Sequence, residues 1–421
     1  MADNSGTSTP TGGVMAPGAV LAPFRYPAFR AIWTANLASN LGSMIQSVAA
    51  AWLMTELTRS HALIALVQAS VTLPILLFGV FAGAIADNFD RRRIMLAAQG
   101  GMLVVSALLA LVSYRGGLAP WSLLGFTLLV GIGTALNGPA WQASVRAQVG
   151  RQDLAQAITL NSIAFNLARS VGPALGGVLI SIWSVSLAFA LNALSYVFLI
   201  VVLLRWHPQV ERPSRTPMLS AIAVGLKFCA TNGPVRRVLL RGACAGFGLA
   251  GYSALLPVIV RQRLQGGEID YGLMLGAFGV ASITAALFVS QLRRRFGSET
   301  VVGLGSVAFI VGYAVIARAG SVPAAMPAAF VAGLGWVLTL TTLNVAMQVR
   351  APNEILGRCL SIYQAVTFGS MALGAWTWGT LSDTLGIPGT LYAAAGFLAA
   401  MLVVLRLFAP MPRVGEGVQP G

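Results

Sequence analysis

Twelve long apolar runs constrain the fold of this chain more than any other feature. Each holds about 20 mostly apolar residues, the length that an α-helix needs to cross a bilayer with its backbone polar groups paired internally. Hydrophobic residues make up 57% of the 421 residues and charged residues only 9%, so a soluble domain could not bury the apolar surface. We therefore predict an all-α integral membrane protein with twelve transmembrane helices, near 29–54, 62–86, 94–114, 119–145, 154–182, 184–204, 236–260, 271–292, 299–318, 323–347, 357–382 and 387–408.

A polar, proline-bearing segment after the sixth run divides the chain into two halves. Residues 219–229 within it place apolar side chains at helical spacing, which predicts a short helix on the inner membrane surface. The halves share landmarks 202 positions apart, which indicates two pseudo-symmetric six-helix bundles. These landmarks are arginines at 91–93 and 293–295, and glycines at 131 and 133, 333 and 335, 172 and 177, and 374 and 379. The predicted boundaries are a flexible tail 1–28, a bundle 29–204, a linker with the surface helix 205–234, a bundle 235–408 and a tail 409–421.

The basic residues predict the orientation of the chain. It carries 27 Lys and Arg against 12 Asp and Glu, a net charge of +15. With both termini inside, twenty of the basic residues fall on the inner side and five in outer loops, and Arg169 and Arg241 lie within runs. Short loops rich in Lys and Arg stay in the cytoplasm, so we predict a multi-pass protein of the cell inner (plasma) membrane with both termini cytoplasmic. Charge spread over loops rather than along one face also argues against a nucleic-acid partner.

The sequence lacks the motifs of catalytic, metal and redox sites. Cys229, Cys244 and Cys359 show no ligand spacing, and the chain has two histidines. A Walker phosphate loop and the common hydrolase motifs are missing. We predict no enzyme activity, no cofactor and no metal, and we expect a monomer whose partners are a small-molecule substrate and membrane lipid.

The segment 83–93, between the second and third runs, concentrates charge. It contains Gly83, Asp87, Asp90, Arg91 and Arg92. Gly83 lets two helices approach closely, and Asp87 can accept charge-assisted hydrogen bonds from arginines or cap a helix N-terminus. A bond between the halves that forms only when the inner side is shut would make this segment a conformational switch. The alternative is that the arginines only fix topology.

Twelve runs, a central linker and the pattern G-x-x-x-D-x-x-x-R-R beginning at Gly83 resemble the major facilitator superfamily, from about Phe29 to Phe408. The D-x-x-D-R-R variant of the loop resembles the exporter branch that includes the enterobactin exporter. The resemblance implies two six-helix bundles around a central cavity, with a substrate site near the midplane between the halves and alternating access to it.

The fifth run contains a second motif, Gly172-Pro173-Ala174-Leu175-Gly176-Gly177. It fits GPxxGG, which resembles the antiporter motif of the superfamily. Proline removes one backbone hydrogen bond, and the glycines permit a bend and close packing. We predict that Gly172, Pro173, Gly176 and Gly177 let this helix flex as the cavity changes sides. Alternatively, they only pack the fifth span closely against the eighth.

Two arginines within runs need partners. Arg169 lies near the middle of the fifth run, where an unpaired charge costs at least about 2.5–3.5 kcal/mol, and no acid of the sequence lies at mid-depth. It either faces the cavity and attracts an anionic substrate, or is held structurally by carbonyls and by Asn161, Asn166 or Asn192. Arg241, near the inner part of the seventh run, is predicted to extend to the membrane interface.

Amide side chains recur on the spans that are expected to line a cavity. An amide facing lipid is costly, so we expect these side chains to face the interior and form a roomy, largely neutral site. The predicted substrate-binding residues are Asn36, Asn40, Gln68, Asn137, Gln142, Asn166, Arg169, Asn344 and Gln364.

Together these features predict a secondary active transporter that moves a small organic molecule by alternating access. The expected direction is proton-coupled efflux of an amphipathic metabolite, siderophore or drug, as the resemblance implies. The fourth run lacks the arginine that the superfamily often places there, and the few acids lie near span ends. The alternatives are an uptake carrier or facilitated diffusion and, in another class, a channel or receptor without turnover.

Overall fold

The computed structural model describes residues 21–207, 218–352 and 355–411, and its described part is helical, without a β-strand. Residues 1–20 of the predicted tail 1–28, residues 412–421 of the predicted tail 409–421 and the linker residues 208–217 lie outside the described residues. The elements are η1 (Ala22–Arg25), α2 (Pro27–Leu57), α3 (His61–Asn88), α4 (Arg91–Tyr114), α5 (Pro120–Ser144), η2 (Val145–Ala147), η3 (Arg151–Asp153), α6 (Leu154–Ile182), α7 (Val185–Arg205), α8 (Met218–Thr231), α9 (Gly233–Val258), η4 (Ile259–Arg263), α10 (Glu268–Arg318), α11 (Val322–Arg350) and α12 (Leu356–Phe408).

Nine helices in the described part are long and apolar enough to cross a membrane. Two of them, α10 and α12, have 51 and 53 residues, so each is about twice as long as one span requires. Gly297 (φ 80°) and Gly386 (φ 69°) interrupt them in the left-handed region that glycine adopts readily, which divides each helix into two arms. Counting the arms separately and adding the 31-residue α2 gives the predicted twelve segments. That all twelve cross the bilayer stays a prediction.

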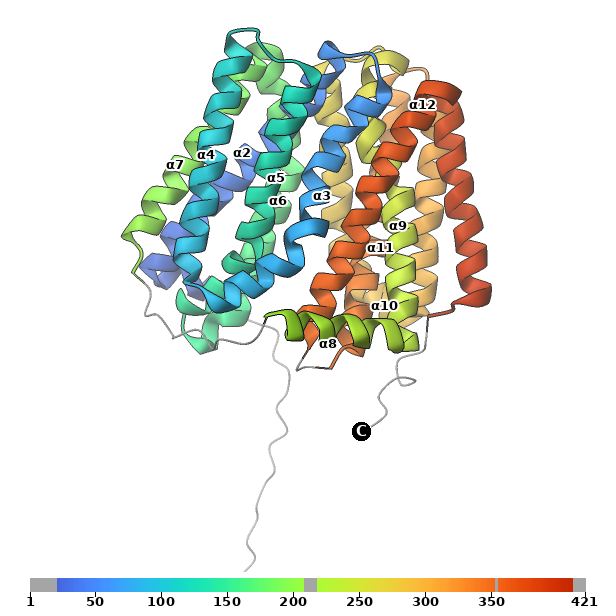
Figure 1. Ribbon diagram of the computed structural model, residues 1–421. Coiled ribbons are helices and arrows are strands. Elements are labelled where there is room, and N and C mark those ends of the chain that lie inside the picture. Colours follow the sequence, from blue (N-terminus) through green and yellow to red (C-terminus); the bar gives the residue numbers. More distant parts are fainter. Residues whose placement is uncertain (1–20, 208–217, 353–354, 412–421) are drawn as a thin grey trace, which may run out of the picture.

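The segments form two bundles, α2–α7 and α9–α12, which lie side by side (Figure 1). We call the end where α2 meets α3 the His61 end, and the end where α3 meets α4 the Arg91 end. α7 ends and α8 begins at the Arg91 end, where α8 lies across the second bundle (Figure 1). Gly225 of α8 faces Arg358 and Ile362 of α12, and Cys229 is buried. The predicted short helix at 219–229 is therefore confirmed as a helix.

Local sequence explains where the helices begin. Ser60, Ser184 and Asn232 accept hydrogen bonds from the backbone N–H three residues later, and so cap α3, α7 and α9. Proline occupies the first turn of α2, α5, α9 and α11, where its missing N–H needs no partner. Small residues then let the bundles meet: Ala65 and Ala69 of α3 pack with alanines of α9 and α12 in a buried cluster.

Candidate functional site

Asp383 of α12 joins the two halves at the His61 end. Its carboxylate accepts hydrogen bonds from the backbone N–H groups of His61 and Ala62, at 2.7 and 3.1 Å, and from the Ser60 hydroxyl at 3.2 Å. The first N–H groups of a helix have no partner within it, and a carboxylate there also interacts favourably with the helix dipole. An acid of the second half therefore caps a helix of the first.

The His61 side chain adds to this contact. Its Nδ1 lies 2.9 Å from Ser382 Oγ, and its Nε2 lies 2.9 Å from Gln262 Oε1. Both partners belong to the second half, so one imidazole links α3 to α12 and to the turn η4.

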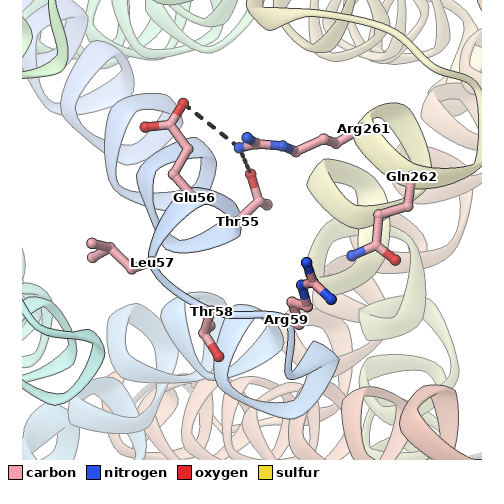
Figure 2. A pocket seen from close by; sticks show the side chains of 7 residues that line it. All are labelled: Thr55, Glu56, Leu57, Thr58, Arg59, Arg261 and Gln262. Carbon is pink, nitrogen blue, oxygen red and sulfur yellow. Dashed lines mark hydrogen bonds and ion pairs between the residues drawn. The ribbon is translucent and has the colours of Figure 1, made fainter.

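A second group of cross-half contacts surrounds the end of α2. Trp52 Nε1 donates to Glu268 Oε1 at 3.1 Å, and its ring stacks on Tyr271. Arg261 donates to Thr55 Oγ1 at 2.8 Å and lies 3.6 Å from the Glu56 carboxylate (Figure 2). Thr55, Glu56 and Arg261 border a hollow of about 670 Å³ that is also lined by Leu57, Thr58, Arg59 and Gln262 (Figure 2).

Glycines bring the helices of the two halves into backbone contact. A Cβ at Gly177 of α6 would lie 2.5 Å from the Glu268 carbonyl oxygen and 3.0 Å from Gly272 Cα of α10. A Cβ at Gly379 of α12 would lie 2.6 Å from Ala65 Cβ and 3.0 Å from the His61 carbonyl oxygen of α3. We call these contacts the α6–α10 seam and the α3–α12 seam.

The GPxxGG segment thus has a packing role. Gly172 and Gly176 face Met44 and Val48 of α2, and the Pro173 carbonyl faces Gly272 of α10. The motif was expected either to let the helix bend or only to pack the fifth span closely against the eighth. The close packing of these two spans is observed. Bending of the helix stays a prediction.

Arg169 and Trp336 meet at mid-depth, between the halves. The guanidinium carbon lies 5.0 Å from the centroid of the indole ring, which is a cation–π contact. The pair joins the middle of α6 to the middle of α11.

The predicted amides come from both halves, and most lie toward the Arg91 end. All except Gln68 fall between the midpoint of their helix or arm and that end. Asn166 donates to the Ser162 carbonyl at 2.8 Å, Asn344 accepts from Gln348 at 2.6 Å, and the buried Asn137 Oδ1 has no described partner. Of the other amide residues, Asn36 is buried, Asn40 and Gln68 are half-buried, and Gln142 and Gln364 are exposed.

The described charged side chains of the segment at the Arg91 end, Asp90 to Arg93, bond within their own half. Asp90 caps α4 by accepting from the Arg92 backbone N–H at 2.9 Å. Arg91 donates to the Ala143 carbonyl at 3.1 Å, and Arg92 donates to the Leu203 and Leu204 carbonyls at 2.8 and 2.7 Å. These carbonyls end α5 and α7, where a cation is favoured. Gly83 and Asp87 belong to α3, but their surroundings lie outside the described residues, so the predicted switch stays a prediction.

The prediction for Arg241 was wrong. Its side chain is only 4% exposed, and it donates to Glu299 and to the Leu405 and Ala409 carbonyls, each at 2.9 Å. Glu299 also accepts from the Met411 backbone N–H. A carboxylate and helix-end carbonyls therefore satisfy this arginine inside the protein.

Sequence reasoning assigned no role to several residues that connect the halves. Asp383, Glu268 and Trp52 were unassigned because an acid or indole near a span end resembles any interfacial side chain. A usable signal existed for Gly379, which lies 202 positions after Gly177 in the repeat and occupies the corresponding place in the other seam.

Comparison with known proteins gives a consistent result. Residues 18–418 match the model of a family described as transmembrane secretion effector. The chain is 26% identical to the staphyloferrin A transporter of Staphylococcus aureus, covering 83% of this chain and 88% of the relative. It is 24% identical to macrolide efflux protein A of Streptococcus pyogenes, covering 90% and 96%. It is 26% identical to the multidrug efflux pump Tap of Mycobacterium tuberculosis, covering 91% and 94%.

Solved structures share the fold at low sequence identity. A bacterial homologue of the human lysosomal transporter Spinster, inward-facing and occupied, superposes with a TM-score of 0.74 at 14% identity, covering 95% of this chain and 99% of the other. A variant of the nucleoside transporter NupG gives a TM-score of 0.75 at 13% identity, covering 92% and 99%.

Proposed function

Because this chain belongs to the transmembrane secretion effector family of the major facilitator superfamily, we propose that it is a secondary transporter that exports a small amphipathic organic molecule by alternating access. The relatives above are named for staphyloferrin A, for macrolides and for multiple drugs, and molecules of these kinds are the first candidates for the substrate. The family consists of transporters rather than enzymes.

One observation carries the mechanism: the two ends of the molecule differ. The halves are bonded to each other at the His61 end, while the exposed amides Gln142, Asn166 and Gln364 lie toward the Arg91 end. Amides on spanning helices are costly in lipid, so their exposure supports a water-filled space between the halves that is open at the Arg91 end. The structure then corresponds to the state in which substrate enters from that end.

The Arg91 end is proposed to face the cytoplasm. Support comes from the excess of arginines in the segments predicted to lie there. A membrane-impermeant maleimide should fail to label a cysteine at position 93 in intact cells and should label it after permeabilisation. Labelling in intact cells would reverse the orientation and, with it, the direction of entry.

Export itself is tested in cells and in proteoliposomes. A strain that lacks the protein should accumulate more of at least one compound in a panel of macrolides, iron chelators and other amphipathic drugs, and the cloned chain should restore efflux. In proteoliposomes, unlabelled substrate on one side should accelerate counterflow of labelled substrate. If deletion of the protein lowers the accumulation of a compound, the protein takes that compound up. If unlabelled substrate does not accelerate the movement of labelled substrate, the protein is a channel or receptor.

Proton coupling is a finer proposal that rests on the resemblance of the GPxxGG segment to an antiporter motif. Collapse of the pH gradient with nigericin should abolish efflux against a concentration gradient while counterflow continues. Efflux that persists without a pH gradient would contradict proton coupling but not transport.

A further inference from the structure

Arg169 is a mid-depth charge without a polar protein partner in the described part of the chain. It is the sixteenth of 29 residues in α6, about 22 Å from the start of the helix and about 20 Å from its end. Its described contact is the ring of Trp336, the fifteenth of 29 residues in α11. In the part of the chain that the structure describes, the acids lie near helix ends, near the kinks of α10 and α12 or in short connections, and none forms an ion pair with Arg169.

The asparagines that could have held Arg169 structurally are engaged elsewhere or have no partner. Asn166 donates to the Ser162 carbonyl of its own helix. Asn192 donates to Gln46 Oε1 and to the Tyr196 hydroxyl. The Asn161 side chain has both amide atoms buried without a described partner. A guanidinium has five N–H donors, and these residues satisfy none of them.

The surroundings of the pair are aromatic on the side of the second half. Trp336 packs edge-on against Phe278, with ring centroids 5.8 Å apart, and Phe278 stacks on Tyr252 at 5.1 Å. The first half therefore supplies a cation, and the second half supplies an apolar wall. A molecule lying between them would touch both halves.

We infer that Arg169 and Trp336 recognise the charged end of the substrate, and that the substrate is an amphipathic organic anion. Its carboxylate, sulfonate or phosphate oxygens accept hydrogen bonds from the Arg169 guanidinium, whose planar donors match such groups. Its apolar body lies against the Trp336–Phe278 wall. The inference rests on the proposed transport function and extends it, because it names the chemical class of the substrate.

The test uses the purified full chain in lipid nanodiscs and probes that share one ring system. Binding of 2-naphthoate, naphthalene-2-sulfonate, 2-naphthyl phosphate, neutral 2-naphthamide and cationic 2-naphthylmethylammonium is measured by equilibrium dialysis. We expect at least one anion to bind about 10- to 100-fold more tightly than the amide, as a hydrogen-bonded charged group predicts. The three anions show which oxygen group fits. Equal binding of anion, amide and cation, or binding of none of them, would overturn the inference.

Substitutions assign the preference to the site. Arg169→Gln should remove the preference for the anion, and Arg169→Lys should keep part of it. Arg115→Gln removes the same charge from an exposed position after α4 and should leave the preference unchanged. A preference that survives Arg169→Gln would contradict the assignment.

Thermal unfolding separates recognition from a structural role. Arg169→Gln removes from the middle of a span a charge that has no polar partner, and the cost of such a charge exceeds what its contact with the Trp336 ring returns, so its Tm should equal or exceed that of the parent chain. A lower Tm together with loss of binding of every probe would mean that Arg169 is structural. Binding needs no turnover, so the two proposals fail separately. A preference for anions without counterflow would support the anion site and contradict transport. Counterflow with equal binding of all probes would support transport and contradict the anion site.

Discussion

An aspartate carboxylate caps a helix at the His61 end and at the Arg91 end of this molecule, but the two caps connect different parts of the chain. At the His61 end, the Asp383 carboxylate caps α3 of the opposite half. At the Arg91 end, the Asp90 carboxylate caps α4 of its own half, and Arg241 and Glu299 pair within the second bundle. A helix cap thus connects the halves at one end and stabilises a single half at the other.

This difference explains how two halves can separate at one end without unfolding. Bonds within a half are kept when the halves move apart, so they determine stability. Bonds between the halves are exchanged during the movement, so they determine which state is populated. The following substitutions test this division, from the largest expected effect to the smallest.

Arg241→Ala should lower stability the most, by about 3–5 kcal/mol, because it leaves a partly buried carboxylate and helix-end carbonyls without their cation. Thermal unfolding in nanodiscs measures the loss. The exposed neighbour Arg237, changed to Ala, is the matched control and should leave Tm nearly unchanged. Spin labels at positions 59 and 385 should report an unaltered distance across the His61 end. A changed distance would contradict the division of roles.

Gly177→Ala and Gly379→Ala should open the His61 end. Each added methyl would overlap the backbone across a seam, at a cost of about 1–3 kcal/mol that separation of the halves relieves. The same pair of spin labels, in a chain without its three cysteines, should show a longer distance. Gly100→Ala of α4, where nothing lies within 4 Å, is the control. An unchanged distance in both seam variants would mean that the seams do not limit closure.

Asp383→Ala and Asp90→Ala compare the two caps directly. Each removes a side-chain cap worth about 0.5–2 kcal/mol. Asp383→Ala should shift the population toward the state that is open at the His61 end, seen as a longer label distance. Asp90→Ala should lower Tm slightly and leave that distance unchanged. Equal effects of the two variants on the distance would contradict the comparison.

Glu268→Gln should have the smallest effect. The amide oxygen of glutamine can still accept the hydrogen bond from Trp52 Nε1, and the stacking of Trp52 on Tyr271 is kept. We expect a change below about 1 kcal/mol in the balance between the two states, measured as the fraction of long label distances. An effect as large as that of Asp383→Ala would show that the charge of Glu268, rather than its hydrogen bond, holds the end closed.

The helices, the two halves and α8 could be predicted because they depend on local patterns. Apolar runs have a fixed length in a bilayer, and the spacing at 219–229 is that of a helix. The runs ending near 292 and 382 could not be recognised as arms of longer helices, because a single glycine at 297 or 386 does not reveal a positive φ.

The site was harder to predict because its contacts join distant parts of the chain. Asp383 and His61 are 322 positions apart, and the carboxylate of Asp383 accepts from the backbone N–H of His61. Arg241 was misassigned because its carboxylate partner, Glu299, lies 58 positions away. Repeat symmetry offered a long-range signal, and it correctly linked Gly177 with Gly379.

The cap by Asp383 has a consequence for how the protein tolerates change. Two of its three donors are peptide nitrogens, which nearly every amino acid provides. Side chains at positions 61 and 62 are therefore free to vary in evolution without removing the cap, proline excepted. Position 383 needs a side chain that accepts hydrogen bonds, so related chains that close in this way should keep an acceptor there even where the cap's donor residues differ.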